Sequence, residues 1–224
     1  MSAEYLILVA GGSGSRMNSS LPKQFLVLNG KEIISHVIHQ FRKYKKDLPI
    51  IIAVHKDHLN LMQSIIDANQ FQNIQICEGG DTRFQSVKNA LNKVTSSSGI
   101  VGIHDAARPL VSLQTIKNCF ETAALKGNAI PAIASGESLR YADTNGSKAV
   151  PRTNYRIIQT PQCFDIAKLK KAFEVNYSEN FTDDATVFEA AGHSIVLVDG
   201  NPENIKITLP KDLIIAKALL DVEQ

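Results

Sequence analysis

Two cations follow a glycine-rich turn near the start of the chain. The stretch LVAGGSGSRMNSSLPKQF, residues 8–25, carries Arg16 and Lys23 seven residues apart. Glycines let backbone N–H groups approach an anion closely, and Arg and Lys side chains suit phosphate oxygens. These residue types at this spacing indicate a phosphate-binding loop, and we expect a nucleoside triphosphate as its ligand. From this stretch alone, a solvated turn with surface charges stays open as the alternative.

Two well-known glycine motifs do not fit the stretch. A Walker A loop needs Gly-Lys-Ser/Thr at a fixed spacing, and no such triplet follows these glycines. The dinucleotide-binding fingerprint needs a third glycine after Gly12 and Gly14, but Met17 stands at that position. A dehydrogenase is therefore disfavoured, and what remains is a glycine loop that supplies its own cations.

Further polar residues stand out later in the chain. They are Asp81, Arg83 and Ser86 in GGDTRFQSV (79–87), Asp105 and Arg108 in HDAARPLV (104–111), Asp183 in FTDDA (181–185), and Lys206 in NIKITLPKDL (204–213). The first two stretches follow apolar runs that read as strands. In open α/β sheets, ligands bind outside the carboxyl ends of the strands. Several such stretches together predict one ligand site at that edge of a sheet. His104, beside Asp105, is expected to pack at the strand end.

Short apolar runs alternate with amphipathic stretches along the chain. We expect buried strands at 5–10, 49–55, 73–80, 99–105, 128–134 and 193–199, and helices at 32–46, 83–94, 113–127 and 211–222, with Gly127 as a C-terminal cap. Strands that alternate with helices predict an α/β fold with a mostly parallel sheet and helices on both faces. The whole chain, 1–224, is expected to form a single domain.

One segment departs from this alternation. Residues 135–164 contain DTNG between SLRYA and KAVPR, which is a hairpin signal. We expect a β-arm that leaves the main sheet over about 135–164.

Composition excludes several classes of protein. The formal net charge is only +2, so no overall charge attracts nucleic acid or an anionic membrane. No apolar stretch approaches the ~20 residues of a membrane span, and no signal peptide is recognised. Cys77, Cys119 and Cys163 are far apart and form no CxxC pair, which favours a cytoplasmic location. Cys119, on an apolar helical face, is expected in the core.

The motifs LVAGGSGSRM, LPKQF, GGDTRFQSV, HDAARP, QTPQ.F, TDDA and NIKIT.P.DL occur in this order at fitting separations. Together they resemble the 2-C-methyl-D-erythritol 4-phosphate cytidylyltransferases of the non-mevalonate isoprenoid pathway, nearly end to end. The resemblance implies a Rossmann-like domain, a protruding β-arm that pairs two subunits into a homodimer, and CMP transfer from CTP to methylerythritol phosphate. A cytidylyltransferase for another polyol phosphate, such as ribitol 5-phosphate, and a non-catalytic nucleotide-binding module are the alternatives.

The resemblance also assigns residues to ligands. It implies that CTP is bound by Ala10, Gly11, Gly12, Gly14, Arg16, Lys23, Gly80, Asp81, Arg83, Ser86, Asp105 and Ala106. It implies that methylerythritol phosphate is positioned by Arg108, Ser138, Arg152, Thr160 and Lys206, with Arg152 reaching the neighbouring subunit's site. Gly11 stands where alanine is common in the family, and Ser138 where threonine is frequent.

The chemistry of this reaction suits these residues. A phosphomonoester has a second pKa of ~6, so at neutral pH it is mostly a dianion and needs no general base. Catalysis then rests on positioning and on neutralising phosphate charge, for which Arg16 and Lys23 are the expected groups. A Mg²⁺ ion is expected on the triphosphate, held mainly by phosphate oxygens and water rather than by a protein cage.

Overall fold

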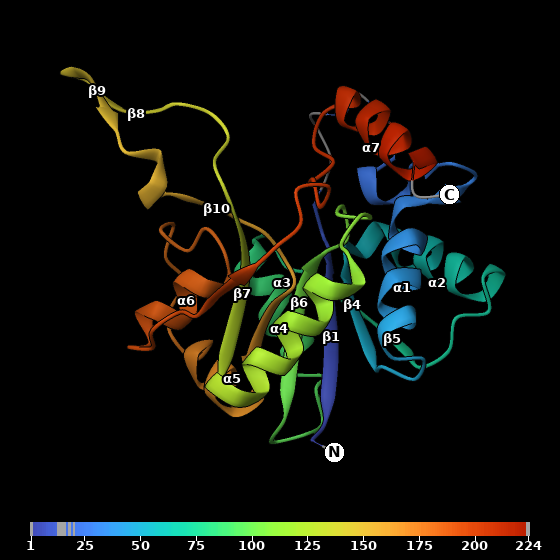
Figure 1. Cartoon of the computed structure of the whole chain (residues 1–224). Coiled ribbons are helices and arrows are strands. Elements are labelled where there is room, and N and C mark those ends of the chain that lie inside the picture. Colours follow the sequence, from blue (N-terminus) through green and yellow to red (C-terminus); the bar gives the residue numbers. More distant parts are fainter. Residues whose placement is uncertain (1, 13–16, 18, 20, 223–224) are drawn as a thin grey trace.

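The computed structural model describes residues 2–12, 17, 19 and 21–222. A mixed sheet runs through the centre of the molecule, helices cover both of its faces, and a two-stranded arm projects from one edge (Figure 1). Main-sheet strands are β1 (Glu4–Ala10), β4 (Ile50–Val54), β5 (Ile74–Glu78), β6 (Ile100–Asp105), β7 (Asn128–Ala134), β10 (Arg156–Ile158), β11 (Gln162–Asp165) and β12 (Leu197–Asp199).

The remaining elements surround this sheet. Two small sheets pair β2 (Val27–Leu28) with β3 (Lys31–Glu32) and β8 (Leu139–Asp143) with β9 (Gly146–Val150). The helices are α1 (Ile33–Tyr44), α2 (Leu59–Ala68), α3 (Arg83–Leu91), α4 (Leu113–Lys126), α5 (Ile166–Ala172), α6 (Asp184–Ala190) and α7 (Pro210–Val222). Short 3₁₀ turns are η2 (Lys23–Phe25), η3 (Lys56–His58) and η4 (Arg152–Asn154). None of the described helices is long and apolar enough to span a membrane.

The strand order is β10-β7-β11-β6-β1-β4-β5, and β12 pairs with β7. Strands β6, β1, β4 and β5 are mutually parallel, whereas β11 runs antiparallel to both β6 and β7, and β10 antiparallel to β7. The predicted mostly parallel sheet is confirmed. Parallel strands bring their carboxyl ends to one edge, so the loops after β1, β5 and β6 meet there.

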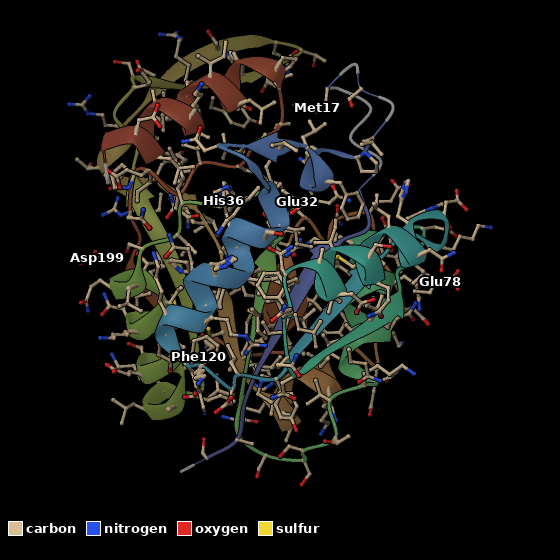
Figure 2. The ribbon with its side chains drawn as sticks, turned by 90° about the vertical axis from the view of Figure 1, so that its right-hand side faces the viewer. Met17, Glu32, His36, Glu78, Phe120 and Asp199 are labelled. Carbon is tan, nitrogen blue, oxygen red and sulfur yellow. The ribbon has the colours of Figure 1, made fainter. Side chains whose placement is uncertain are left out.

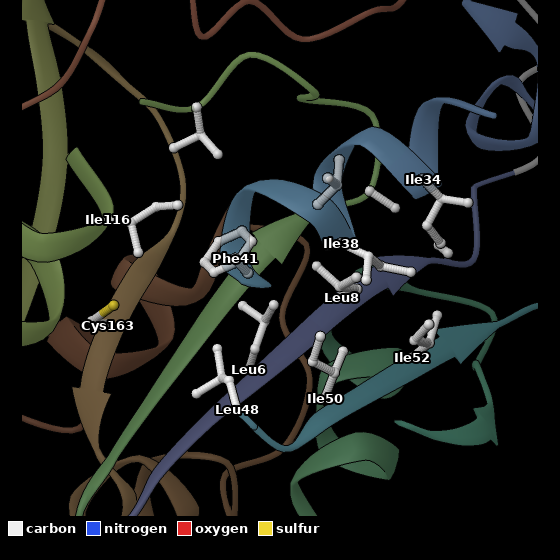
Figure 3. Packing of buried hydrophobic residues seen from close by; sticks show 14 of the residues in the cluster. Leu6, Leu8, Ile34, Ile38, Phe41, Leu48, Ile50, Ile52, Ile116 and Cys163 are labelled. Carbon is white, nitrogen blue, oxygen red and sulfur yellow. The ribbon is translucent and has the colours of Figure 1, made fainter. Parts of the chain in front are cut away.

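Side chains of the central strands alternate between two apolar layers. Leu6 and Leu8 of β1 pack with α1, α2 and α4 on one face, where Phe41 and Ile116 close the layer (Figure 3). Ile7 of β1 points to the opposite face, where α3, α5 and α6 pack. Since successive strand residues face opposite sides, a strand buried on both faces needs the unbroken apolar run seen in the sequence. In the side view, α1 lies between α4 and α2 on the face of the sheet that carries Leu6 and Leu8 (Figure 2).

A third, smaller apolar cluster joins distant parts of the chain. Met17, Leu28 and Ile33 from the N-terminal region pack with Ile207 and with Ala216 of α7. Figure 2 shows Met17 beside β2 and the start of α1. Met17 and the β2–α1 region are thereby packed against the C-terminal segment.

Two of the expected buried strands are more exposed than predicted. Strand β5 ends the sheet, and its Gln75 and Glu78 are exposed. The run 193–199 contributes only the three residues of β12, of which Leu197 is exposed. An edge strand has one neighbour only, so an apolar run does not by itself guarantee burial.

The predicted arm is present but shorter than expected. Strands β8 and β9 pair in register from Leu139↔Val150 to Asp143↔Gly146 and project away from the body (Figure 1). The boundary at 164 is wrong, because β10 and β11 return to the main sheet, where Phe164 is fully buried. Both return strands are short and pair with strands distant in the chain, so the local pattern did not separate them from the arm.

The predicted helices are confirmed with small shifts at their ends. Helix α3 stops at Leu91 rather than 94, and α4 ends at Lys126 with Gly127 as its cap, which has the left-handed φ of 90°. Such a φ is open to glycine without a Cβ clash, as expected for this cap. Cys119 lies fully buried on α4, as predicted. Helices α2, α5 and α6 were not predicted.

Candidate active site

A cavity of about 320 Å³ opens at the carboxyl-end edge of the sheet. Its walls come from the loops after β1, β5 and β6, from η2, and from the segment before α7. Among its lining residues are the predicted site residues Gly11, Gly12, Lys23, Gly80, Asp81, Arg83, Ser86, Asp105, Ala106 and Lys206. Residues scattered over the chain thus meet in one place, as the strand-end argument predicted. Gly14 and Arg16, also predicted here, lie outside the described residues.

A second cavity, of about 190 Å³, adjoins the first. It is lined by Arg108, Thr160 and Asp183 among others, and it shares Arg83, Asp105 and Lys206 with the larger cavity. These three residues therefore form a common wall, and two ligands seated in the two cavities would meet at it.

The common wall is a cluster of charges centred on Asp105. Arg83 Nη1 lies 2.7 Å from Asp105 Oδ1, while Arg108 Nε and Lys206 Nζ lie 3.1 and 3.0 Å from Oδ2. Arg83 Nη2 also pairs with Asp184 Oδ2 at 2.6 Å. Three cations face two carboxylates, so the cluster carries a formal charge of +1 and suits a phosphate group.

Burial and pairing act in opposite directions on Asp105. Burial alone would raise the pKa of this carboxyl, but Arg83, Lys206 and Arg108 together hold the pKa well below its ordinary value. For the more deeply placed Asp184, burial raises the pKa although Arg83 opposes it. Asp105 is therefore ionised at neutral pH and fixes the three cations in place.

A chain of hydrogen bonds supports Asp105 from inside the protein. The Asp105 backbone N–H donates to Thr160 Oγ1 at 3.1 Å, and the Thr160 hydroxyl lies 2.9 Å from His104 Nδ1. His104 Nε2 lies 3.1 Å from the Arg108 carbonyl. A carbonyl oxygen only accepts, so the ring's proton is on Nε2, and Nδ1 accepts from Thr160. Burial lowers the pKa of His104 to about 4, which keeps the ring neutral.

His104 lines neither of these two cavities. It is fully buried and its ring meets that of Phe41 edge-on at 5.0 Å. The predicted packing role at the strand end is confirmed.

Comparison with known proteins decides the family. The chain matches the family model "2-C-methyl-D-erythritol 4-phosphate cytidylyltransferase" over residues 5–222. The chain belongs to this family. The curated protein of that name from Bacteroides thetaiotaomicron is 44% identical over 216 residues, covering 96% of this chain and 98% of the relative. The one from Porphyromonas gingivalis is 42% identical over 218 residues, covering 96% and 97%.

Solved structures agree with this assignment. The crystal structure of 4-diphosphocytidyl-2C-methyl-D-erythritol synthase from Anaerococcus prevotii matches with a TM-score of 0.85 at 26% identity, covering 98% of this chain and 96% of that one. That of 2-C-methyl-D-erythritol 4-phosphate cytidylyltransferase from Thermus thermophilus has a TM-score of 0.78 at 28% identity, covering 97% and 99%. The Rossmann-like fold is confirmed, and the chain is a nucleotidyltransferase.

As a member of the methylerythritol phosphate cytidylyltransferases, the protein transfers CMP from CTP to 2-C-methyl-D-erythritol 4-phosphate in isoprenoid precursor synthesis. The predicted activity is thereby confirmed.

Within the described part of this cytidylyltransferase, three predicted site residues lie outside both cavities. Ala10 is buried at the end of β1. Ser138 and Arg152 are exposed at the base of the arm, where Arg152 Nη1 donates to the Gly136 carbonyl at 3.0 Å. Their predicted contacts with ligand stay predictions.

Ser86 has a structural task in the turn after β5. Its Oγ accepts from the Gly80 N–H at 3.0 Å and donates to the Thr82 carbonyl at 2.9 Å. Cβ atoms added at Gly11 and Gly79 would come within 3.2 and 3.1 Å of this oxygen. The hydroxyl thus fixes the Gly80–Asp81 turn against the glycine loop.

Sequence reasoning missed Gln24 and Thr208, which line the larger cavity, and Asp184, which pairs with Arg83. The TDDA motif held the signal for Asp184. Asp183 caps α6 by accepting from the Thr186 N–H at 2.9 Å, so the following carboxylate begins the helix and is buried. Two adjacent acids at a helix start can therefore serve as one cap and one inward ion pair.

Proposed function

We propose that CTP occupies the larger cavity and methylerythritol phosphate the smaller one, with the transferred phosphoryl group at the wall between them. The observation that carries this proposal is that Arg83, Asp105 and Lys206 line both cavities. The reacting oxygen of one substrate and the α-phosphorus of the other must come together. A wall of paired cations common to both sites supports a meeting point there.

The triphosphate end of CTP is assigned to the glycine loop and Lys23. Lys23 lines the larger cavity together with Gly11 and Gly12. The family resemblance adds Gly14 and Arg16 to this group. Lys and Arg charges near the α- and β-phosphates would stabilise the negative charge that develops on the leaving pyrophosphate.

The base and ribose are assigned to the turn after β5. Gly80 and Asp81 line the cavity, and Ser86 fixes their backbone through the two hydrogen bonds described above. We assign to Ser86 a positioning role, because its hydroxyl already donates one hydrogen bond and accepts another within the turn.

The second substrate is assigned to Arg108, Thr160 and Lys206. A phosphate dianion entering the smaller cavity would compete with Asp105 for Arg108 and Lys206. One of its oxygens then attacks the α-phosphorus of CTP, a new P–O bond forms, and the bond to the pyrophosphate oxygen breaks. The nucleophile is already ionised, so no side chain needs to remove a proton. Neutral His104 is directed at Thr160 and the Arg108 carbonyl instead.

We also propose Mg²⁺ as the cofactor, held mainly by triphosphate oxygens and water. No cluster of three or more His, Cys, Asp or Glu side chains suited to a metal occurs among the described residues. Asp105 does not fit as a ligand, because both of its oxygens already pair with cations. When bound, the ion would neutralise phosphate charge.

A homodimer formed through the arm is a further part of this proposal. A two-stranded hairpin is marginally stable in water. The arm carries the exposed Tyr141, and the turn η4 that follows it ends at the exposed Tyr155. A second arm across a twofold axis would cover such side chains. Arg152 would then complete the partner subunit's smaller cavity.

Location in the cytoplasm, without a nucleic acid partner, completes the proposal. The three cysteines are free and buried, which suits a reducing compartment.

The placement of the two substrates is tested by kinetics. Pyrophosphate release is measured with CTP and either methylerythritol phosphate or ribitol 5-phosphate. Lys23→Ala should raise the KM for CTP alone, whereas Lys206→Ala should raise the KM values of both substrates. Lys211→Ala, an exposed lysine on α7, is the matched control. If Lys206→Ala affects only one substrate, the shared-wall arrangement is wrong.

The dimer is tested by mixing two strongly impaired proteins, Arg152→Ala and Lys23→Ala. A mixed dimer would contain one site with both defects and one site with neither. Activity should then approach about a quarter of wild type when subunits mix at random. If labelled subunits exchange and no activity returns, Arg152 does not act across the interface.

A further inference from the structure

Gln24 reaches across the start of the glycine loop. Its side-chain Nε2 donates to the Ala10 carbonyl at 2.6 Å and lies 3.5 Å from the Gly12 carbonyl. The residue is almost fully buried, yet it lines the larger cavity beside Lys23. One amide group therefore holds two carbonyls that lie on either side of Gly11.

These contacts fix which way the loop's peptide groups face. In a trans peptide the C=O and the following N–H point in opposite directions. With the Ala10 carbonyl held by Gln24, the Gly11 N–H points away from Gln24. An amide N–H that faces an anion site is the feature by which glycine loops bind phosphate.

The turn η2 holds Gln24 in this position. Phe25 N–H donates to the Pro22 carbonyl at 2.9 Å, and Leu26 N–H donates to the Lys23 carbonyl at 3.1 Å. The neighbouring Phe25 is buried in the apolar layer that contains Leu6 and Leu8, with its ring 5.6 Å from that of His58. Lys23 and Gln24 thus lie next to each other on one anchored turn, so the cation and the amide that holds the loop carbonyls are adjacent.

We propose that Gln24 is a positioning residue for CTP, which orients the Ala10–Gly12 backbone toward the triphosphate. The proposal rests on CTP occupying the larger cavity. Binding of CTP depends on Gln24 as a hydrogen-bond donor, whereas binding of methylerythritol phosphate does not.

The decisive substitution is Gln24→Glu, which keeps the shape and removes the donor. An ionised carboxylate facing two carbonyls repels them, so kcat/KM for CTP should fall about tenfold or more at pH 8. The KM for methylerythritol phosphate should stay within about twofold of wild type. Burial and the two facing carbonyls should raise the pKa of this carboxyl above the ordinary value for Glu. The protonated carboxyl group is again a donor, so the deficit relative to wild type should shrink as pH falls from 8 to 6. A purely structural role would instead lower activity toward both substrates.

Two further variants complete the experiment. Gln24→Met leaves the carbonyls without a donor but adds no charge, so it should weaken CTP binding by a factor that does not change with pH. It also decides the question if Gln24→Glu does not fold. Gln72→Glu is the matched control, since Gln72 is an exposed glutamine whose Nε2 donates to a backbone carbonyl, that of Gln70.

Each outcome separates this proposal from the placement of CTP. If CTP titrated by calorimetry binds both Gln24 variants as tightly as wild type while Lys23→Ala weakens it, Gln24 does not position the loop. If Lys23→Ala is also without effect on CTP affinity, the placement of CTP in the larger cavity fails first. If both Gln24 variants weaken binding of CTP and of methylerythritol phosphate by the same factor, the role is a general structural one and the proposal is overturned.

Discussion

Replacing Asp105 by asparagine should cost the protein both stability and activity. The side chain is only 8% exposed and contacts three cations. Asn keeps the shape and one acceptor oxygen but removes the charge. The formal charge of the cluster then rises from +1 to +2 in a largely buried place.

The size of the loss follows from how each cation can respond. Removing one member of a buried ion pair costs about 3–5 kcal/mol. Lys206 is 43% exposed, so solvent screens its share, and Arg83 keeps Asp184 as a partner. We therefore expect Asp105→Asn to lower the free energy of unfolding by about 2–4 kcal/mol at pH 7. For a chain of this length, that corresponds to roughly 5–15 °C in Tm.

The loss should depend on pH in one direction. The pKa of Asp105 is lower in the folded protein than its ordinary 3.8. A lowered pKa stabilises the fold at every pH above the unfolded value, and the contribution disappears as pH falls through the folded value. The difference between wild type and variant should thus be constant above about pH 5 and shrink below pH 4.

Urea unfolding followed by circular dichroism measures this difference at pH 7, 5 and 3.5. Asp199→Asn is the control, because Asp199 is exposed on β12 and lies at the outer edge of the molecule (Figure 2). It should change the free energy of unfolding by no more than about 0.5 kcal/mol. If Asp105→Asn is as stable as wild type at pH 7, the carboxylate does not hold the cluster together.

Three further predictions concern activity and acid stability. Lys23→Ala and Arg16→Ala should each lower kcat by roughly 10²-fold with little change in Tm, and near-normal kcat in either would refute the assignment. The turn after β5 should set the choice of nucleotide. Asp81→Ala should therefore lower the ratio of kcat/KM for CTP to kcat/KM for UTP, while Lys23→Ala should leave that ratio unchanged. The folded pKa of His104, about 4, lies below the unfolded 6.5, so the unfolded chain binds more protons between these values. His104 should therefore lower the free energy of unfolding of wild type by about 3 kcal/mol between pH 7 and pH 4. Urea titrations of His104→Gln should lack this contribution.

The sequence predicts the parallel part of the fold well and the antiparallel part poorly. Strands β1, β4 and β6 are recognisable in the sequence as apolar runs, because helices cover both faces of the sheet at these strands. Strand β11 is equally buried, but its four residues follow a proline-containing turn and pair with β6 and β7 in the opposite sense. Nothing local distinguishes such a strand from the arm that precedes it.

The site was predictable where residue type and strand end coincide. Asp105 and Arg83 stand directly at or after strand ends, so their meeting follows from the topology. Gln24 and Asp184 could not be found this way, because their roles depend on which neighbour they face. A glutamine in a loop is ordinary until its amide is seen to reach two carbonyls.

The segment before α7 has a consequence for how the enzyme is made. Ile207 N–H bonds the Ala107 carbonyl at 2.9 Å, and Lys206 reaches Asp105, so a late part of the chain closes a site begun by β1. The ribosome synthesises the chain from the N-terminus. Strand β6 can therefore pair with β1 as soon as it is made, but with β11 only after residue 165 has been added. During translation the nascent chain therefore exposes an unpaired strand edge and an incomplete set of cations around Asp105. We expect a chain stopped before Lys206 to leave the ribosome without a working site, and catalytic competence to be the last property the growing protein acquires.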